Sequence, residues 1–502
     1  MKKIALLLAV ITVIAAFGGC VGKTPDNGKN TRGTADTAAD TEEQRKYADY
    51  LPDVKYDGYE FLFYSWDIEG WRKYEDIFVE DSGTDPISRN VFNRNSKIED
   101  KYDIVIQYKA EDFNRYFINV QRLTSSGDYY ADIDLSMGLS AGLLMRQECF
   151  YNLYDVPYLN FDMPWWDHDC VNSLSINGYL PFGSTAVTLI EKAGAYCVFY
   201  NLGLANDLSI TDNLYQAVIN GEWVQDKIKA MGKIASKDMD GDTKISNFDV
   251  DRWGIVGNDS GVTALFSGSD CRFVDKDESG ELYASFDSAH NIDAIKSFLE
   301  NILFDTDLYF NGSYTDGANI IDMFTDDRAL FLLHTLSSGE NLRNMKSDYA
   351  ILPVPKYNEE QKNYGCAPNV FDNFLTSVPI TLNAEGCERS GIILEALAAE
   401  SLYTVIPAFY EQVLDEKIAR DDYSKKMIEI ITNSHVWDVG EFYGLGGFPD
   451  AFRGITGKSA GTTGIQQTSD IVSFYATYGP TMIADMESLV ERAEQLKENA
   501  ES

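Results

Sequence analysis

The chain has 502 residues, of which 44% are hydrophobic and 24% are charged, as in an ordinary globular protein. Its formal net charge of −37 excludes the basic surface that nucleic-acid binding requires, and it disfavours a strongly anionic ligand. A solvated acidic surface is sufficient to explain this charge. The length remaining after the first fifty residues predicts two domains or one large bilobed unit.

The first residues have the pattern of a secretory signal. Two lysines precede an apolar stretch at residues 4–17, which is shorter than the about 20 residues that span a bilayer. Two glycines follow, and then Cys20. The segment Phe17–Cys20 resembles a bacterial lipobox, although Phe17 stands where Leu is usual. The resemblance implies a signal peptide at residues 1–19 and a lipid on Cys20; ordinary secretion is the alternative.

The segment after the signal, residues 20–54, is rich in Thr, Asp, Gly, Asn and Ala. It cannot bury enough apolar surface to offset its ordering entropy, so we expect a flexible tether. A lipid and a tether would hold a folded domain at the extracellular face of the cell membrane.

The first folded elements alternate between strand and helix patterns. Asp85 is expected to cap a helix that begins at Pro86. The alternation predicts an α/β domain on a largely parallel sheet. The expected strands and helices are residues 59–64, 86–102, 104–106, 112–125 and 131–136.

A second set of elements begins near Gly178. From residue 388 onward the chain is mostly helical, and Pro407 is expected to kink or end one helix. No Gly/Ser-rich linker interrupts residues 55–490, which favours two lobes joined by short crossings. The expected elements are strands at 195–201, 329–333 and 349–355, and helices at 223–235, 293–304 and 483–496.

An acidic loop carries the sharpest local motif. Aspartates at positions one, three, five and twelve match the oxygen-ligand spacing of an EF-hand-type calcium loop, in which position seven donates a backbone carbonyl. Position six is Thr243 rather than Gly, so it would have to accept an unfavourable backbone angle. A plain Asp-rich turn is the alternative, and either role is structural. The candidate calcium ligands are Asp238, Asp240, Asp242, Lys244 and Asp249.

The spacing of the cysteines does not indicate a metal-binding motif. The six cysteines after Cys20 include no CxxC pair, so a Cys-rich metal site is not expected. Disulfides are possible in an oxidising compartment, but their pairing stays open.

The order of several segments resembles extracellular solute-binding proteins of family 1, the sugar-binding lipoproteins of ABC transporters. The segments are YEFLFYSWD, NRNSKIEDKYDI, GDYYADIDLSMG, NLYDVPYLNFDMPWWD, FYNLGL, GEWVQDKI, DDRALFLLH and YAILPVPKYNEEQKNYG. The resemblance implies a type II periplasmic-binding fold, in which two α/β lobes close over a ligand cleft and a helical region follows. It divides the chain into a first lobe of residues 55–168 and 325–385, and a second lobe of residues 169–324 and 386–502.

A sugar site needs flat aromatic rings together with hydrogen-bonding side chains. Such groups are expected near strand ends, lobe crossings and Gly-rich loops, where a cleft would lie. For each aromatic residue, packing in the core is the alternative. The candidate ligand residues are Ser65, Trp66, Asp67, Trp165, Trp166, Asp167, Tyr364, Asp372, Trp437 and Tyr443.

These patterns predict a binding protein and not an enzyme. The four histidines occur in no HExxH motif, and the chain has no GxSxG, P-loop or strand-linked GxGxxG. We expect a mono- or oligosaccharide ligand, which the protein delivers to the permease subunits of an ABC importer, with a possible structural calcium ion and no organic cofactor. A peptide or cationic solute is one alternative, which the acidic charge would favour. A surface glycoside hydrolase is another.

Overall fold

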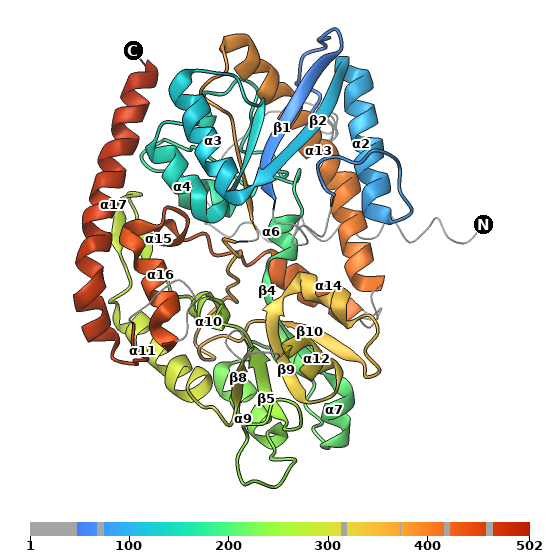
Figure 1. The fold of residues 1–502 in the computed structure, drawn as a ribbon, viewed down its shortest axis with the longest axis vertical. Coiled ribbons are helices and arrows are strands. Elements are labelled where there is room, and N and C mark those ends of the chain that lie inside the picture. The colour runs from blue at the N-terminus through green and yellow to red at the C-terminus, as the bar shows by residue number, and fades with distance from the viewer. Residues whose placement is uncertain are drawn as a thin grey trace, which may run out of the picture. The chain divides into compact units, whose positions relative to one another are not determined.

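The computed structural model describes residues 48–67, 75–312, 319–371, 373–415, 422–457 and 465–501. The predicted signal peptide, Cys20 and most of the predicted tether lie outside these residues. Lys46–Ser502 form one compact unit. Within it, two separate sheets form the cores of two lobes (Figure 1).

The first lobe contains a four-stranded sheet with the order β11-β3-β1-β2. Its central strand β1 (Tyr59–Asp67) pairs in parallel with β2 (Ile104–Asp112) and β3 (Ile133–Met137). The late strand β11 (Phe374–Ser377) pairs antiparallel with β3. The sequence predicted the three early strands at these positions.

Helices connect the strands of the first lobe. α2 begins where the sequence predicted, because the Asp85 carboxylate accepts a hydrogen bond of 2.9 Å from Ser88 N and Pro86 is the first residue. The helices and turns of this part are α2 (Pro86–Tyr102), α3 (Phe113–Ser126), α4 (Gly138–Arg146), η1 (Leu153–Asp155), α5 (His168–Leu174) and α6 (Ile190–Ala193).

The second lobe contains a five-stranded sheet with the order β10-β4-β9-β5-β8. β5 pairs in parallel with β8 and β9, whereas β4 pairs antiparallel with β9 and β10. The bounds are β4 (Tyr196–Asn201), β5 (Trp253–Gly257), β8 (Tyr309–Asn311), β9 (Ala329–Thr335) and β10 (Tyr349–Pro353).

The remaining elements of the second lobe surround this sheet. Trp223 and Trp253 are buried in its core. The helices are α7 (Leu202–Asp207), α8 (Leu214–Ile219), α9 (Gln225–Ala235), α10 (Gly261–Gly268), α11 (Ala289–Phe298), η2 (Leu299–Leu303), α12 (Ile320–Thr325) and η4 (Leu336–Leu342). A hairpin of β6 (Val274–Lys276) and β7 (Leu282–Ala284) completes the lobe.

The structure draws the lobe boundaries differently from the sequence analysis. β9 and β10 fall inside the expected first-lobe range 325–385, but both pair within the second sheet. Only β11 at the end of that range joins the first sheet. Strand pairing depends on tertiary contacts, and the local sequence of a buried apolar strand does not indicate the sheet to which the strand belongs.

The long helix α13 (Ala384–Asp415) belongs to the first lobe, whereas the sequence analysis placed it in the second. It packs along α2, and the fully buried Arg94 of α2 donates a hydrogen bond of 3.0 Å to Ser401 of α13. The helix continues through Pro407 rather than ending there. It is long and apolar enough to cross a membrane, but 72% of its apolar window is buried inside the protein, as in a core helix.

The last elements lie at the lobe boundary and along both lobes. α14 packs against β10 and α8 of the second lobe, and α15 packs against α4 and α5 of the first. The bounds are α14 (Asp422–Thr432), α15 (Val439–Phe442), η5 (Leu445–Gly447), α16 (Phe448–Arg453), η6 (Gly454–Thr456) and α17 (Ile471–Glu501).

Candidate functional site

In each of the two sheets, a parallel strand has its carboxyl end beside a point where the chain crosses between the lobes. In the second sheet, Thr335 at the end of β9 pairs with Tyr196, where the chain enters from the first lobe. In the first sheet, Met137 at the end of β3 pairs with Phe374, where the chain returns. Ligands of open α/β sheets bind beyond the carboxyl ends of strands. The first candidate site is therefore the region around these strand ends and their paired residues, Met137, Phe374, Tyr196 and Thr335. We call it the strand-end face.

The end of β1 brings Trp66 to the strand-end face. Its ring packs edge-on against Phe113 and Phe374, with centroid distances of 6.1 and 5.7 Å. The side chain is 3% exposed, and among the described residues its indole Nε1 has no hydrogen-bond partner. A buried N–H without a partner is costly, so this group is suited to donate to a ligand oxygen.

The neighbours of Trp66 differ in exposure. Ser65 is buried, and its hydroxyl donates to the Trp66 carbonyl at 3.1 Å, so it belongs to the sheet. Asp67 is partly exposed and is the last residue of β1. The following residues 68–74 lie outside the described part of the chain.

In the second lobe, residues that follow β5 and residues of β8 line a small cavity of about 60 Å³. Tyr309 donates from its hydroxyl to the Asn258 carbonyl at 2.8 Å, which holds the turn after β5 against β8. The polar lining residues are Asn258, Asp259, Thr306, Asn311, Thr456 and Gln467. None of these lining residues was predicted from the sequence as a ligand residue. The polar pair Asn258 and Asp259, which closely follows the apolar run at residues 253–256, was the signal that could have found them.

Asn373 is a further polar residue at the strand-end face that the sequence analysis missed. It precedes β11 and is fully buried, and neither atom of its side-chain amide has a hydrogen-bond partner within the described residues. The predicted ligand residue Asp372 beside it lies outside the described residues. Asn373 and Trp66 thus leave buried donors and acceptors unsatisfied at the same end of one sheet.

Trp165 and Trp166 lie in the core of the first lobe. Their indole N–H groups donate to the two carboxylate oxygens of Glu395 at 2.9 and 3.0 Å, and the Tyr50 hydroxyl donates to the same carboxylate. Burial raises the pKa of Glu395 to about 7. Both tryptophans thus take the alternative role, packing in the core around one buried carboxylate.

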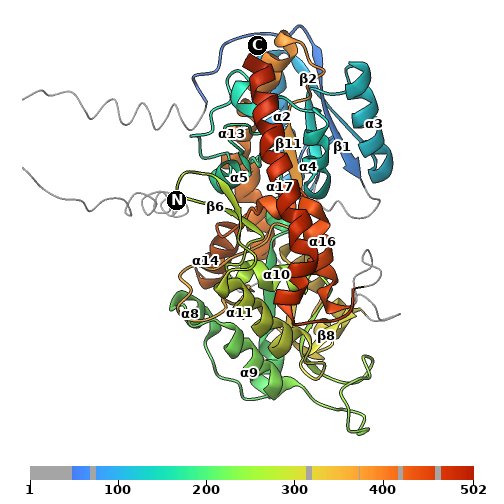
Figure 2. The same cartoon turned by 90° about the vertical axis from the view of Figure 1, so that its left-hand side faces the viewer.

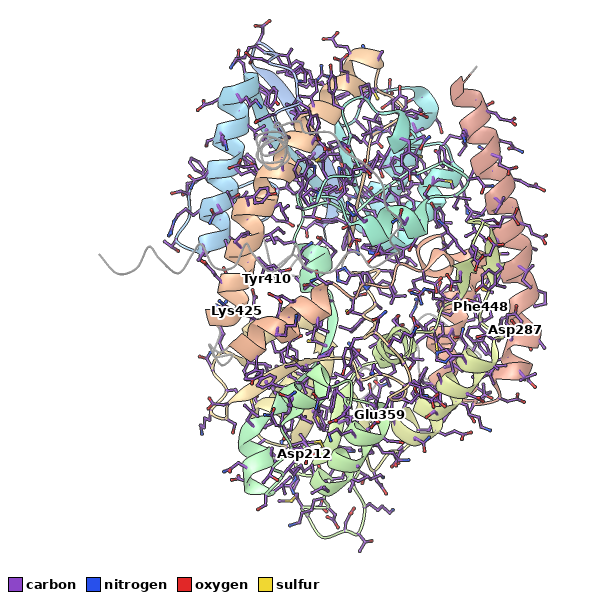
Figure 3. All side chains as sticks on the ribbon, turned by 180° about the vertical axis from the view of Figure 1, so that it is seen from behind. Asp212, Asp287, Glu359, Tyr410, Lys425 and Phe448 are labelled. Carbon is purple, nitrogen blue, oxygen red and sulfur yellow. The ribbon has the colours of Figure 1, made fainter. Side chains whose placement is uncertain are left out.

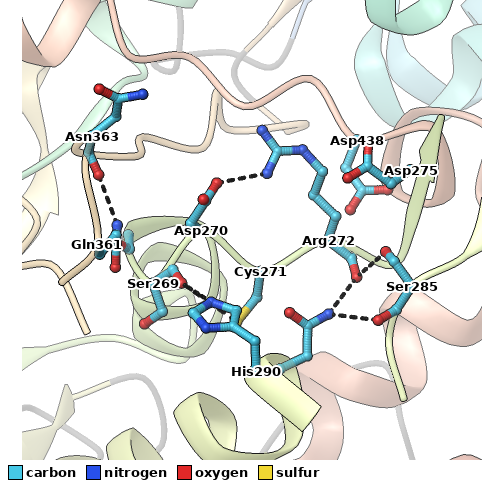
Figure 4. A network of polar contacts seen from close by, with 12 residues as sticks. Ser269, Asp270, Cys271, Arg272, Asp275, Ser285, His290, Gln361, Asn363 and Asp438 are labelled. Carbon is cyan, nitrogen blue, oxygen red and sulfur yellow. Dashed lines mark hydrogen bonds and ion pairs between the residues drawn. The ribbon is translucent and has the colours of Figure 1, made fainter. Parts of the chain in front are cut away.

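A larger cavity of about 500 Å³ lies between the lobes and is the second candidate site. Its lining includes two predicted ligand residues, Tyr364 and Trp437. Asp270 and Arg272 form an ion pair of 2.8 Å in its wall (Figure 4). The other charged lining residues are Asp169, Lys362, Lys426 and Glu429. In Figure 2, α5 and α14, which border this cavity, lie on one side, and β1 and β8 lie on the opposite side.

Hydrogen bonds restrain both aromatic side chains of the larger cavity. Trp437 is 3% exposed and donates from Nε1 to Asp167 at 3.1 Å, and Tyr364 donates to the Val218 carbonyl at 3.0 Å. Burial acts to raise the pKa of Asp167, but the His435 ring, whose Nδ1 lies 3.6 Å from the carboxylate, outweighs it, so the pKa lies below its ordinary value. Asp167 also accepts from Cys170 N at 2.9 Å and so caps α5.

Tyr443 lines neither of the two cavities. It is buried, and its hydroxyl donates to the Leu174 carbonyl at 2.7 Å. The Gly-rich segment that was expected to reach a cleft thus packs against the first lobe.

The acidic loop folds around its own carboxylates. Asp238, Asp240 and Asp251 each place one carboxylate oxygen within 4.8 Å of the others. Asp251 takes the place that the sequence analysis gave to Asp249. Thr243 has a φ of 73°, the left-handed angle that the motif requires at position six.

Backbone N–H groups hold the carboxylates of this loop. Asp238 accepts from Gly241 N at 2.6 Å and from Thr243 N at 2.7 Å, and Asp251 accepts from Met239 N at 2.9 Å. Each carboxylate keeps lone pairs beyond these bonds. The donor set of clustered carboxylate oxygens therefore fits a calcium ion.

The structure is similar to those of ABC solute-binding proteins. One is an ABC substrate-binding protein from Listeria monocytogenes in complex with cycloalternan, with a TM-score of 0.51, 10% identity, and coverage of 87% of this chain and 99% of that chain. Another is a cyclo/maltodextrin-binding protein complexed with maltotetraose, with a TM-score of 0.52, 10% identity, and coverage of 88% and 98%. The chain therefore shares the fold of these binding proteins. This confirms the predicted two-lobed α/β class and the helical C-terminal region.

Comparison of the sequence with known proteins identifies neither a family nor a curated relative. No protein-family model matches the chain. No curated protein matches it either. At 10% identity the solute-binding fold is shared while the side chains are not, so the residues that bind a solute must come from the geometry of this chain.

Proposed function

We propose that the protein is the extracellular, lipid-anchored solute-binding component of an ABC importer, and that it binds a mono- or oligosaccharide at the strand-end face without turnover. The observation that carries the proposal is that parallel strands of both sheets have their carboxyl ends beside the chain crossings between the lobes. The two similar structures hold cycloalternan and maltotetraose, which supports a carbohydrate ligand.

The groups at the strand-end face suit a sugar. Phe113 and Phe374 place flat rings around the Trp66 indole, and Trp66 and Asn373 offer buried polar atoms that have no partner among the described residues. Sugars present apolar ring faces and a rim of hydroxyl groups, so both kinds of group would be used.

A thermal-shift screen tests the ligand class. The panel contains maltotetraose, a cyclic glucan, a polyamine and a short peptide, because the net charge of −37 also favours a cationic solute. A ligand present at 100 times its Kd adds about 2.7 kcal/mol to the free energy of unfolding, so the melting temperature rises. A shift with the polyamine or the peptide alone, and with neither glucan, would replace the carbohydrate proposal.

Two matched tryptophan variants locate the solute. Trp66→Phe keeps an aromatic ring at the strand-end face but removes the unpartnered N–H, and we expect at least a tenfold loss of affinity, or about 1.4 kcal/mol. Trp437→Phe makes the same change in the larger cavity and is expected to leave the affinity unchanged. Calorimetric titration of both variants decides between the sites, because the reverse result would place the solute in the cavity.

We also propose that the acidic loop binds calcium through Asp238, Asp240 and Asp251, with a structural role. The supporting observation is the clustering of their carboxylate oxygens within 4.8 Å. A bound calcium ion would add positive charge among carboxylates in a strongly acidic chain.

A further inference from the structure

The C-terminal helix α17 runs along both lobes. It extends over 31 residues, and in Figures 1 and 2 it passes from the level of the second lobe to that of the first. Each half of the helix contacts a different lobe.

The first half of α17 is anchored to the second lobe by aromatic packing. Phe474 lies 5.5 Å from Phe448 of α16 and 6.2 Å from Phe286, measured between ring centroids. Tyr475 stacks on Phe286 at 5.7 Å. Phe448 is labelled in Figure 3. Just before the helix, Ser469 donates to Glu300 at 2.8 Å.

The second half of α17 is anchored to the first lobe. Arg146 of α4 binds the Asp485 carboxylate through two nitrogens, at 2.8 and 3.1 Å. Asn177 donates to Glu494 at 2.9 Å. Between these polar contacts the helix buries Leu489 and Ala493 completely.

The two anchors are separated by a weak point in the helix. Pro480 lies inside α17, where it lacks the N–H that would bond to the preceding turn. Prolines are the commonest cause of sharp helix bends. The last aromatic residue of the first half, Tyr478, and the first ion-paired residue of the second half, Asp485, lie on either side of it.

Because both anchors are specific contacts, the lobes cannot separate on this side unless α17 bends or releases one anchor. We propose that α17 is a strap that limits the separation of the two lobes and bends at Pro480 when they move. The proposal concerns the lobes themselves and does not depend on which solute the protein binds.

Distances between spin labels on the two lobes test the strap. Ile118 of α3 and Ile234 of α9 are 60% and 58% exposed, so each can be replaced by a labelled cysteine, in a background with Cys20→Ser. The six other cysteines are buried and should not react. The measurement is made on the full chain without ligand.

The test variant is Leu489→Asp/Ala493→Asp, which places charges in the fully buried contact of the second half. The control is Val472→Asp, which makes the same type of change at a position of α17 that is 61% exposed. We expect the test variant to show a broader distance distribution with an added longer-distance population, and the control to match the wild type. New tryptic cleavage at Arg492 and Lys497 reports that the second half has detached.

A detached second half with an unchanged distance distribution would overturn the proposal. If the double variant does not fold, Arg146→Gln removes the paired charge at the first-lobe anchor and is expected to broaden the distribution to a smaller extent. Its control is Asp305→Asn, which breaks the Lys233–Asp305 pair inside the second lobe. An unchanged distribution in Arg146→Gln would then overturn the proposal equally.

Discussion

Glu395 illustrates what single residues contribute to the first lobe. It lies on α13 and accepts hydrogen bonds from Trp165, Trp166 and Tyr50, which come from distant parts of the chain. Sequence reasoning identified the two tryptophans as notable but could not find their common partner, which is 230 residues away from Trp165. An aromatic pair beside a predicted crossing has the same appearance whether it faces a ligand or a buried carboxylate.

The raised pKa of Glu395 predicts a pH dependence of stability. The carboxyl group keeps its proton up to a pKa of about 7 in the folded state, whereas the unfolded chain releases it near 4.5. The folded state therefore binds more protons in this window, and the free energy of unfolding falls as the pH rises through it, by about 3 kcal/mol in total. We expect Glu395→Gln to remove this contribution to the slope in denaturant unfolding between pH 5 and 7.

A control on the same helix separates this effect from general charge repulsion. Glu400 pairs with the exposed Lys97 at the surface, so Glu400→Gln should keep the wild-type slope. Equal slopes in wild type and Glu395→Gln would show that the buried carboxyl group does not set the dependence.

At the scale of elements, local sequence signals located strands and helices well. The cap at Asp85, the strands β1 to β4 and the helix α9 lie close to their expected positions, because capping residues and apolar patterns act within a few residues. The acidic loop was also found, down to the strained angle at Thr243. Its third clustered carboxylate was not, because the chain folds back and brings Asp251 rather than Asp249 toward Asp238.

The calcium proposal is testable on this loop. We expect calcium to raise the melting temperature relative to a sample with chelator, because an ion that binds only the folded state stabilises it. Asp240→Asn should abolish the shift, whereas Asp249→Asn should retain it, since Asp249 lies outside the cluster. If the calcium-induced shift is lost with Asp249→Asn and kept with Asp240→Asn, the proposed ligand set is wrong and Asp249 is a ligand, as the spacing predicted.

At the scale of the whole molecule, the chain has the two-lobed α/β fold of the similar binding proteins, and the lipid anchor belongs to the proposed function. The lipobox-like segment ends at Cys20, which lies outside the described residues. We expect Cys20→Ser, expressed in a bacterium that processes lipoproteins, to move the protein from the membrane fraction to the soluble fraction. Labelling with radioactive palmitate should mark the wild type and not the variant. Equal membrane association of the wild type and the variant would contradict the proposed lipid anchor at Cys20.

The sequence by itself determined the fold class: the α/β alternation, the individual strands and helices, and the acidic loop all follow from short-range patterns. The tertiary structure decided the rest. It assigned β9 and β10 to the second sheet and α13 to the first lobe, and it buried Trp165, Trp166 and Tyr443 while it left the Trp66 N–H unpartnered at a strand end. The physical reason is that propensity and periodicity are local properties, whereas strand pairing and the partner of a buried polar group depend on residues hundreds of positions apart.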